Sequence, residues 1–340
     1  MGAPATSGGF PRKNEGFAEA YVALEAGTMI LQSSARVGAY NCYNDPDPMN
    51  TTAWDPTGHC VGHFTMTGGS LLNDTANIGN NLFIGFTGGD GYVQFLNNSV
   101  VRLGFLQVGN ADMRTYLNEA GGTSTIWRYG DAELKIGKDA DVTAESFTLY
   151  DNPNTELQIE IGGSADFSSL ACSGPVIIGG IWSTDIPHDV SCKLKIGLVG
   201  YAPVESDEFV IVTAGTTMTT EPFSAIITDP LSAGLGWGAK VADGNKLVLY
   251  VAHMGDANDD GAVNVGDLGI LAGNWNQSGK LWGEADFTGD RTVNVGDLGV
   301  LAGNWGWTRP PSAPGNVPEP ASLILLGLGG LGLLRPRRKA

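Results

Sequence analysis

The sequence predicts a mainly β protein whose long body is followed by a small helical module. Glycine supplies 50 of the 340 residues, about twice its usual share, without the third-residue period of collagen. Short segments of alternating apolar and polar residues, separated by glycine and asparagine turns, fill the chain up to residue 252. A loop-and-helix pattern then occurs twice. We therefore expect a parallel β-helix (solenoid), then a loop–helix pair, then a C-terminal apolar helix.

Charge and length limit the classes of function. The chain has 19 basic and 36 acidic residues, which gives a formal net charge of -17. This balance would repel nucleic-acid phosphates, so we expect no nucleic-acid partner. An acidic chain suits a calcium-rich extracellular setting. At 340 residues, the chain can hold one large domain with a buried core and smaller appendages.

Residues 1–19 are expected to form a disordered N-terminus. They contain no apolar segment like the core of a secretory signal peptide. Because the C-terminal residues described below indicate export, we expect the true N-terminus to lie upstream of Met1.

Residues 20–252 are expected to form the β-helical body. Ile or Val followed by Gly recurs, and most of the spacings fall between roughly 17 and 28 residues, within the repeat periods of solenoids. Segments such as Glu133–Ile136 and Glu156–Ile161 alternate, so each would turn one face inward and stack on its neighbours. Phe64–Leu71 and Asn80–Gly85 resemble the repeats of autotransporter-like β-helical surface proteins. A jelly roll or sandwich is the alternative, since the repeats are irregular.

Glu208–Ala214 and Lys246–Val251 are the clearest strands in the sequence, because both are continuous runs rich in β-branched and apolar residues. We expect them to cover the open end of the solenoid, which would otherwise expose strand edges. This segment resembles the closing unit of the same surface proteins.

The four cysteines form two local pairs, Cys42 with Cys60 and Cys172 with Cys192. In an exported protein, disulfides are the expected state of such pairs, although the sequence does not establish the connectivity. A zinc site is the alternative at the first pair, because His59 and His63 add donor atoms next to Cys60.

Residues 253–307 hold two copies of a calcium-loop pattern. Oxygen-bearing side chains follow the ligand layout of an EF-hand loop, and one backbone carbonyl adds a further ligand. The first site is expected to use Asp256, Asn258, Asp260, the carbonyl of Ala262, Asn264 and Asp267. The second is expected to use Asp286, Thr288, Asp290, the carbonyl of Thr292, Asn294 and Asp297. Ca²⁺ prefers about six to eight such oxygens, so Ca²⁺ is the expected cofactor.

Each loop is expected to lead into a short amphipathic helix. The apolar residues at helical spacing are Leu268, Leu271, Ala272 and Trp275 in the first copy, and Leu298, Leu301, Ala302 and Trp305 in the second. The two helices should pack on each other about a pseudo-twofold axis. Gly269 and Gly273, repeated as Gly299 and Gly303, would allow a close approach.

The module resembles a type I dockerin, the paired loop–helix calcium module that docks onto cohesins. The resemblance implies a cohesin-type partner. However, Val265-Gly266 and Val295-Gly296 stand where cohesin-binding dockerins carry a Ser-Thr pair, so a calcium-clamped module without a cohesin is the alternative. Arg291 stands where glycine is expected at positive φ, which costs on the order of 1 kcal/mol. We therefore predict tighter Ca²⁺ binding at the first site.

Residues 308–316 are expected to form a Pro-rich linker. Residues 317–340 comprise Val317, Pro318, Glu319 and Pro320, an apolar segment over 321–334, and a basic tail over 335–339 with Arg335, Arg337 and Arg338. This order resembles the PEP-CTERM sorting signal, which implies an exosortase-type sorting enzyme as partner. A helix over 321–334 would be about 21 Å long, against a hydrocarbon core of about 30 Å. A transient stop in the membrane is thus favoured over a permanent anchor.

Polysaccharide hydrolysis is the enzyme class to test, and it needs two carboxylates about 5 to 9.5 Å apart. Candidate carboxylates are Asp151, Glu156, Glu160 and Asp166. No spacing selects a pair among them, so the catalytic residues stay unassigned. Candidates for a sugar-stacking platform are Trp127, Trp182 and Trp237, or Tyr92 and Tyr150.

These features together predict an exported protein at the cell surface or in the extracellular matrix of a bacterium. We expect a structural or adhesive role with polysaccharide as a contact. The alternative is a component of polysaccharide degradation, either a glycan-binding protein or a hydrolase.

Overall fold

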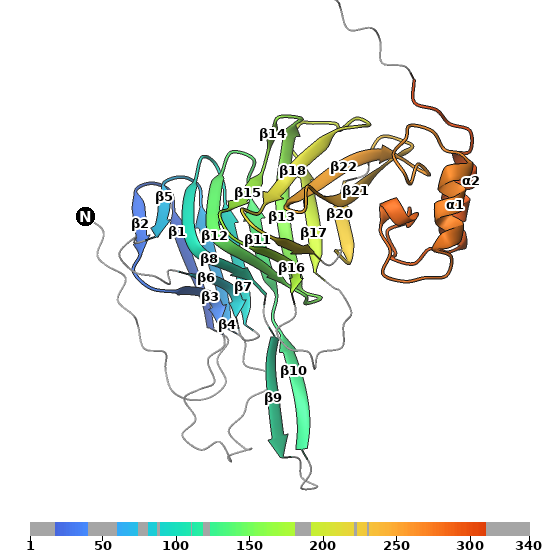
Figure 1. Ribbon diagram of the computed structural model, residues 1–340. Coiled ribbons are helices and arrows are strands. Elements are labelled where there is room, and N and C mark those ends of the chain that lie inside the picture. Colours follow the sequence, from blue (N-terminus) through green and yellow to red (C-terminus); the bar gives the residue numbers. More distant parts are fainter. Residues whose placement is uncertain are drawn as a thin grey trace, which may run out of the picture.

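The computed structural model describes residues 18–39, 60–73, 81–86, 89–109, 111–117, 123–180, 192–220, 223–229 and 231–310. Within these ranges the protein is mainly β, and its helices lie near the C-terminal end of the described chain (Figure 1). Most strands belong to two large sheets, called sheet A and sheet B below. The predicted mainly β class is confirmed.

Sheet A is built from strands that follow one another in chain order. They are β1 (Ala18–Leu24), β4 (Cys60–Met66), β7 (Asp90–Phe95), β11 (Ala132–Ile136), β13 (Thr155–Gly163), β17 (Lys193–Leu198) and β20 (Ala225–Thr228). All of these neighbours pair in parallel, and only the short β14 (Asp166–Phe167) adds an antiparallel pairing, to β13. Parallel neighbours need a crossover connection, and strands of sheet B lie within these connections.

Sheet B consists of strands that alternate along the sequence with those of sheet A. Its main path joins β2 (Thr28–Leu31), β5 (Ser70–Asn73), β8 (Val100–Val108), β12 (Asp141–Tyr150), β15 (Ser169–Cys172), β18 (Glu208–Thr213), β22 (Lys246–His253) and β21 (Leu235–Ala242). The branches are β3 (Ala35–Ala39), β6 (Leu82–Phe86), β16 (Val176–Gly180) and β19 (Met218–Thr220). Pairing is parallel from β2 to β18, which excludes an antiparallel jelly roll for these strands.

The core is made of apolar residues at alternate strand positions. In sheet A, the chain of in-register partners Phe95, Ile136, Ile159 and Ile196 is at most 2% exposed. Burial of each such side chain stabilises the fold by roughly 1.5–3 kcal/mol. The alternation predicted for Glu156–Ile161 is confirmed, because its apolar residues are buried and its polar residues are partly exposed.

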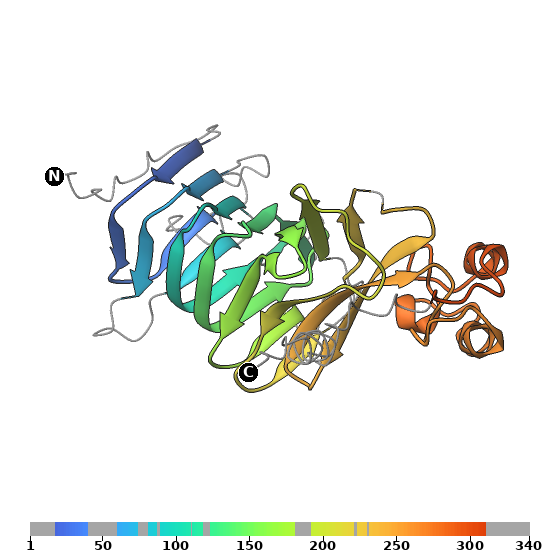
Figure 2. The ribbon, with the colours of Figure 1, turned by 90° about the horizontal axis from the view of Figure 1, so that it is seen from above.

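The body ends in antiparallel strands. β22 pairs antiparallel with both β18 and β21. The two strands predicted to close the body are therefore present, as β18 and β22. They lie at the end of the body next to the helical module (Figure 2), where β18 is the last strand of the parallel row.

The strands β9 (Ala111–Leu117) and β10 (Thr123–Tyr129) form a hairpin that the sequence analysis did not predict. They pair antiparallel with each other and with no other described strand, and they project away from the body (Figure 1). The hairpin lies between β8 and β11 along the chain.

The helical module contains α1 (Val265–Gly273), the 3₁₀ helix η1 (Trp282–Glu284) and α2 (Val295–Gly303). Asn264 caps α1 by accepting the N–H of Gly266 at 2.7 Å, and the Asp267 carboxylate accepts the N–H of Asn264 at 2.9 Å. Asn294 and Asp297 repeat this capping box at α2. A capping box satisfies backbone donors at the helix start that otherwise lack partners. The predicted order of loop and helix is confirmed twice.

Several predicted segments lie outside the described residues. They are residues 1–17 of the N-terminus, residues 311–316 of the linker, and the segment 317–340 with its apolar stretch and basic tail. β1 already begins at Ala18, so the predicted disordered boundary at residue 19 is wrong by two residues. No helix in the described ranges is long and apolar enough to cross a membrane.

Candidate metal centre

The second loop brings three carboxylates together. One oxygen from each of Asp286, Asp290 and Asp297 lies within 4.8 Å of the others. Asp286 is 4% exposed and Asp297 is fully buried, so their charge is removed from water. The Thr288 hydroxyl also lies 3.1 Å from Oδ1 of Asp297. Four of the six predicted ligands of this site thus meet in one place, and the donor set is one of hard oxygens.

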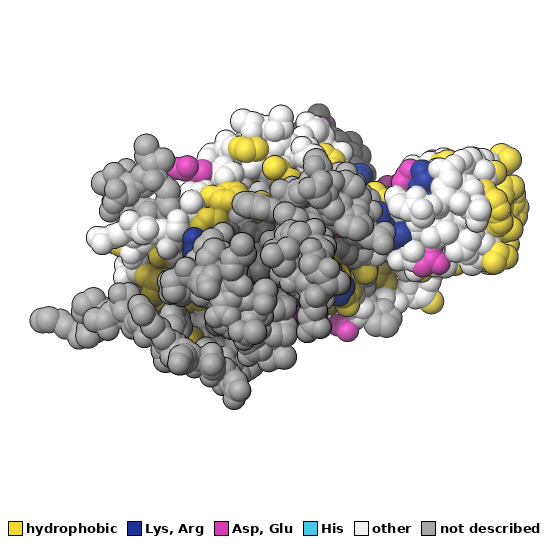
Figure 3. All heavy atoms as spheres, turned by 90° about the horizontal axis from the view of Figure 1, so that it is seen from below, with side chains coloured by type: hydrophobic (Ala, Val, Ile, Leu, Met, Phe, Trp, Pro, Cys, Tyr) yellow, Lys and Arg dark blue, Asp and Glu magenta, His cyan; other side chains and the backbone are white. Residues whose placement is uncertain are grey.

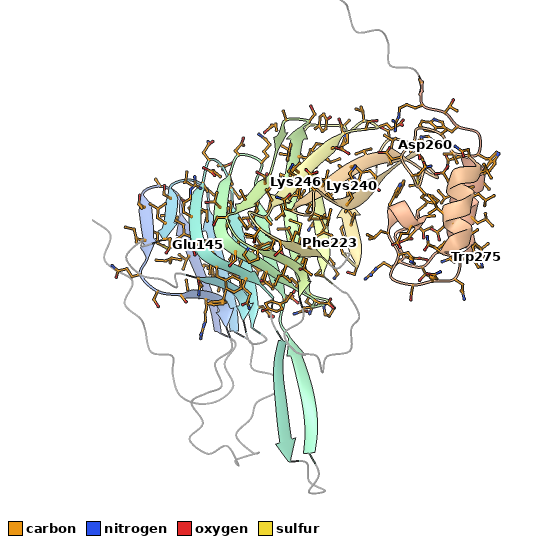
Figure 4. All side chains as sticks on the ribbon, in the orientation of Figure 1. Glu145, Phe223, Lys240, Lys246, Asp260 and Trp275 are labelled. Carbon is orange, nitrogen blue, oxygen red and sulfur yellow. The ribbon has the colours of Figure 1, made fainter. Side chains whose placement is uncertain are left out.

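The first loop also holds buried carboxylates, although the triad within 4.8 Å is found in the second loop of the described chain. Asp256 and Asp267 are both fully buried. Oδ1 of Asp267 accepts the N–H of Ala257 at 2.8 Å, and Oδ2 of Asp256 accepts the N–H of Gly261 at 2.9 Å. Asp260 lies in this loop (Figure 4), and its Oδ2 accepts a hydrogen bond from Nδ2 of Asn258 at 2.9 Å. These contacts wrap the loop backbone around the carboxylates.

Burial opposes the negative charge of these carboxylates. In Asp256, burial raises the pKa to about 6, and the neighbouring charges of Asp267 and Asp260 act in the same direction. Burial likewise raises the pKa of Asp286, with Asp297 and Asp290 as its charged neighbours. Buried like charges are stabilised when a cation binds among them. The electrostatics of both loops therefore fit a divalent cation.

Asn264 and Asn294 have a role that the sequence analysis did not assign. The Oδ1 atom of each accepts the helix-capping N–H at 2.7 Å. Their Nδ2 atoms donate to the carbonyls of Ala262 at 3.3 Å and Thr292 at 2.9 Å, which are the predicted carbonyl ligands. The sequence signal that could have predicted this capping role is the S/T/N/D-x-x-D/E spacing before an apolar run. These asparagines therefore cap the two helices.

The backbone of each loop holds one non-glycine residue at positive φ. Arg291 has φ of 64°, as its position predicted, while Gly261 takes the equivalent place in the first loop with φ of 84°. The first loop also holds a non-glycine residue at positive φ. Asp259 has φ of 54°, and the equivalent residue of the second loop is Gly289, with φ of 73°. Asp tolerates this region better than Arg. The strain difference between the loops is thus smaller than the sequence analysis assumed.

The two halves of the module are joined by reciprocal backbone hydrogen bonds. The segment after α2 pairs with the first loop, since the N–H of Val263 donates to the carbonyl of Trp307 at 2.9 Å. The segment after α1 pairs with the second loop, since the N–H of Val293 donates to the carbonyl of Gln277 at 3.1 Å. Thr308 also bridges to Ala262, so residues 308–310 continue the module and do not begin a free linker.

The outer faces of α1 and α2 differ from the prediction. Leu271 and Leu301 are buried, but Trp275 is 45% exposed and Trp305 is 52% exposed. The glycines predicted to allow close helix approach have no atom within 4 Å of an added Cβ, so that prediction is wrong. These glycines are themselves exposed. Hydrophobic side chains gather at this end of the molecule (Figure 3), and Trp275 lies near the end of α1 (Figure 4).

Three of the four candidate carboxylates of the body are paired with lysines. Glu160 lies 2.8 Å from Lys135, Asp166 lies 3.1 Å from Lys138, and Glu156 lies 3.6 Å from Lys195. Glu133, which the sequence analysis did not consider, is in register with Glu156 on one side and with Tyr92 on the other. Burial raises the pKa of Glu133, and the charge of Glu156 adds to this. Two carboxylates therefore lie side by side next to an aromatic ring.

Two of the candidate sugar-stacking residues, Trp237 and Tyr92, pack against other aromatic rings. Trp237 is only 8% exposed and packs on Phe209, with ring centroids 5.8 Å apart. Tyr92 stacks on His63 at 4.9 Å, and His63 stacks on Tyr21 at 4.4 Å. The faces of His63 are thereby occupied on both sides. Trp182 and the side chain of Trp127 lie outside the described part of the structure.

The second predicted disulfide is absent. Cys172 and Cys192 are separate buried thiols, because Cys172 ends β15 in sheet B while Cys192 directly precedes β17 in sheet A. Cys42, His59 and the side chain of Cys60 lie outside the described part. The ring Nε2 of His63, the remaining donor of the zinc alternative, lies 3.0 Å from Glu19.

Comparison with known proteins identifies the C-terminal segment. Residues 316–339 match the PEP-CTERM protein-sorting motif. This range includes the predicted signal residues Val317, Pro318, Glu319, Pro320, Arg335, Arg337 and Arg338. The motif indicates an exported protein that is sorted at the cell surface by an exosortase-type enzyme, so this prediction is confirmed. No curated protein sequence matches the chain.

Proposed function

We propose that this surface-sorted protein is a structural or adhesive component of the bacterial envelope or matrix, with a calcium-dependent module. The observation that carries the proposal is the convergence of Asp286, Asp290 and Asp297 within 4.8 Å, in a loop that the chain repeats. Ca²⁺ suits this site because it accepts carboxylate, hydroxyl and carbonyl oxygens in a flexible arrangement, whereas Mg²⁺ demands a stricter octahedron.

Thermal unfolding of the full chain tests the calcium proposal. We expect EDTA to lower the melting temperature, and CaCl₂ to raise it more than MgCl₂ does at the same concentration, because a ligand that binds only the folded state stabilises it by mass action. Asp256→Ala and Asp290→Ala should each reduce the calcium effect. Asp243→Ala, in an exposed turn where Asp243 pairs with Lys246 at 2.8 Å, is the control and should keep the full effect. An unchanged melt with EDTA would contradict the proposal.

The body is proposed to be a parallel β-helix. Its support is that sheet A and sheet B both grow by parallel pairing while the chain alternates between them. Such a body presents long, repetitive outer rows of polar side chains, which suit a structural or polysaccharide-contacting role. Binding of the full chain to a panel of polysaccharides, with and without Ca²⁺, would test the contact.

A dockerin-like architecture is part of the proposal, and its support is the reciprocal pairing of the two loop–helix halves. A cohesin-type partner is less well supported. Val265 and Val295 are each 73% exposed, so the helix starts offer apolar side chains where cohesin-binding dockerins carry hydroxyl groups. This favours a module that acts within its own chain.

Polysaccharide cleavage is a second candidate function, favoured by the neighbouring carboxylates Glu133 and Glu156. Adjacent strands lie roughly 4.8 Å apart, close to the carboxylate separation of about 5 Å in retaining glycosidases. Glu133, whose pKa is raised by burial, would serve as the acid and Glu156 as the nucleophile. Release of reducing ends that is lost in Glu133→Gln and Glu156→Gln, but kept in Glu160→Gln, would establish this function. Absence of release from the unmodified chain would leave the structural role.

A further inference from the structure

Trp282 contacts the first turn of both metal loops. Its side chain is 7% exposed. The indole N–H donates a hydrogen bond to the main-chain carbonyl of Asp256 at 3.2 Å. The ring also meets Phe287 edge to face, with centroids 5.3 Å apart and planes at 81°. Asp256 is the first predicted ligand of one loop, and Phe287 directly follows the first predicted ligand of the other. One side chain therefore touches both candidate sites.

The same indole lies against the body. A Cβ added to Gly236 of β21 would stand 2.2 Å from the Cη2 and Cζ3 atoms of Trp282, so glycine is needed for this approach. Gly238 makes room in the same way for Tyr250 of β22, since an added Cβ would stand 2.2 Å from Cζ of its ring. Glycines two residues apart lie on one face of a strand, so this face of β21 is left bare for two aromatic rings.

β21 is thus shared by two cores. Its Trp237 side chain packs in the body core against Phe209. On the other side, Tyr250 and Ala252 of β22 are buried in one cluster with Trp282, Val263 and Leu301 of the module. The strands at the end of the body therefore cannot open without exposing apolar side chains of the module. The domain boundary predicted at residue 253 is therefore not a boundary in the packing, because side chains on both sides of it share one buried cluster.

We propose that calcium binding is coupled through Trp282 to the closing strands β21 and β22, so that the metal-loaded module serves as the end cap of the body. This inference rests on the proposed calcium binding. A metal that binds only the ordered loops stabilises every element whose opening disorders those loops. Calcium outside the cell then holds the end of the body closed, and loss of calcium loosens β21 and β22 before the parallel strands.

Hydrogen exchange on the full chain, metal-free and with CaCl₂, tests the coupling. With calcium at about a hundred times its dissociation constant, loop amides should exchange about a hundredfold more slowly. Full coupling predicts slowing of the same order for the amides of Leu247–His253. Slowing in the loops with no change in β22 would overturn the coupling and leave calcium binding intact. No slowing anywhere would overturn the calcium proposal and this inference with it.

Two variants test the assigned residue. Trp282→Phe removes the indole N–H and the ring atoms that face Gly236, and Gly236→Ala pushes the ring away from β21. Both should reduce the calcium effect in β22 to below about threefold while loop amides still slow with calcium. Trp275→Phe on the exposed face of α1 is the matched control for the first variant. Gly197→Ala is the control for the second, because its nearest atom is 3.7 Å from an added Cβ. A full effect in Trp282→Phe would overturn the role of Trp282.

Discussion

The Arg309 guanidinium donates a hydrogen bond from Nη2 to Oδ1 of Asp259 at 3.0 Å, and its Nε also donates to Glu205. Asp259 belongs to the first of the two proposed calcium loops, whereas Glu205 lies in the turn that precedes β18 of the body. A residue placed in the linker by the sequence analysis therefore ties the module to the body. Glu205 is 17% exposed in this pair, which limits screening by water.

Replacement of Arg309 should weaken the whole chain. We expect Arg309→Met to lower the free energy of unfolding by about 1 kcal/mol, because two partly buried carboxylates lose their partner. Arg102→Met is the control, since Arg102 and Asp141 form a pair whose side chains are 39% and 58% exposed. Its effect should stay below about 0.5 kcal/mol. Urea unfolding measures the free energy of unfolding of both variants. Equal losses in Arg309→Met and Arg102→Met would show that Arg309 contributes no more to stability than a surface ion pair does.

The second site should gain affinity when its strained residue is removed. Arg291→Gly relieves a positive φ of 64° and removes a cation from the loop. We expect its calcium affinity to rise about fivefold, which corresponds to about 1 kcal/mol. Asp243→Gly, at φ of 54° in a turn outside the module, should leave calcium affinity unchanged. Two equally tight sites in the unmodified protein would contradict the predicted order of affinity.

Calcium binding should weaken in acid. Burial raises the pKa of Asp256 to about 6 in the metal-free protein, above the unfolded value of about 3.9. This group therefore stabilises the metal-free fold most below pH 4, and its contribution is lost as the pH rises through about 6. Calcium needs the ionised carboxylate, so we expect about tenfold weaker binding at pH 5 than at pH 7.5. Calorimetry at both values checks this, and a constant affinity would show that Asp256 is not a ligand.

Cys172 and Cys192 should behave as protected thiols. Burial raises the pKa of each to about 12, so little reactive thiolate forms near neutral pH. We expect iodoacetamide to spare both residues in the folded chain and to modify both after denaturation without a reductant. Peptide mapping measures this directly. A peptide pair linked through Cys172 and Cys192 would restore the disulfide that the sequence predicted.

Local patterns predicted much of the fold. Alternation identified β13 and β11, and continuous β-branched runs identified β18 and β22, because these signals depend on the residues of one strand. The duplicated loops were recognisable because ligand spacing is fixed within a short stretch. Arg291 was correctly placed at positive φ for the same reason. The hairpin of β9 and β10 was missed because an insertion between repeats leaves no periodic signal.

Contacts between residues far apart in the chain could not be predicted from the sequence. The pairing of Cys172 with Cys192 failed because the two residues lie on different sheets, which their separation along the chain does not reveal. The glycines of α1 were assigned to a helix interface because small residues suit either a close approach or an exposed face. Trp282 was overlooked because no motif marks it. Its approach to β21 depends on Gly236, and the alternate spacing of Gly236 and Gly238 in β21 was the available signal.

Isothermal titration calorimetry of the metal-free full chain with CaCl₂ tests the central claim most directly. We predict two calcium ions per chain, the tighter at the first loop, with the stoichiometry falling to one in Asp290→Ala. Binding of no calcium, or a stoichiometry unchanged by Asp290→Ala, would contradict the assignment of the paired loops as the metal centre.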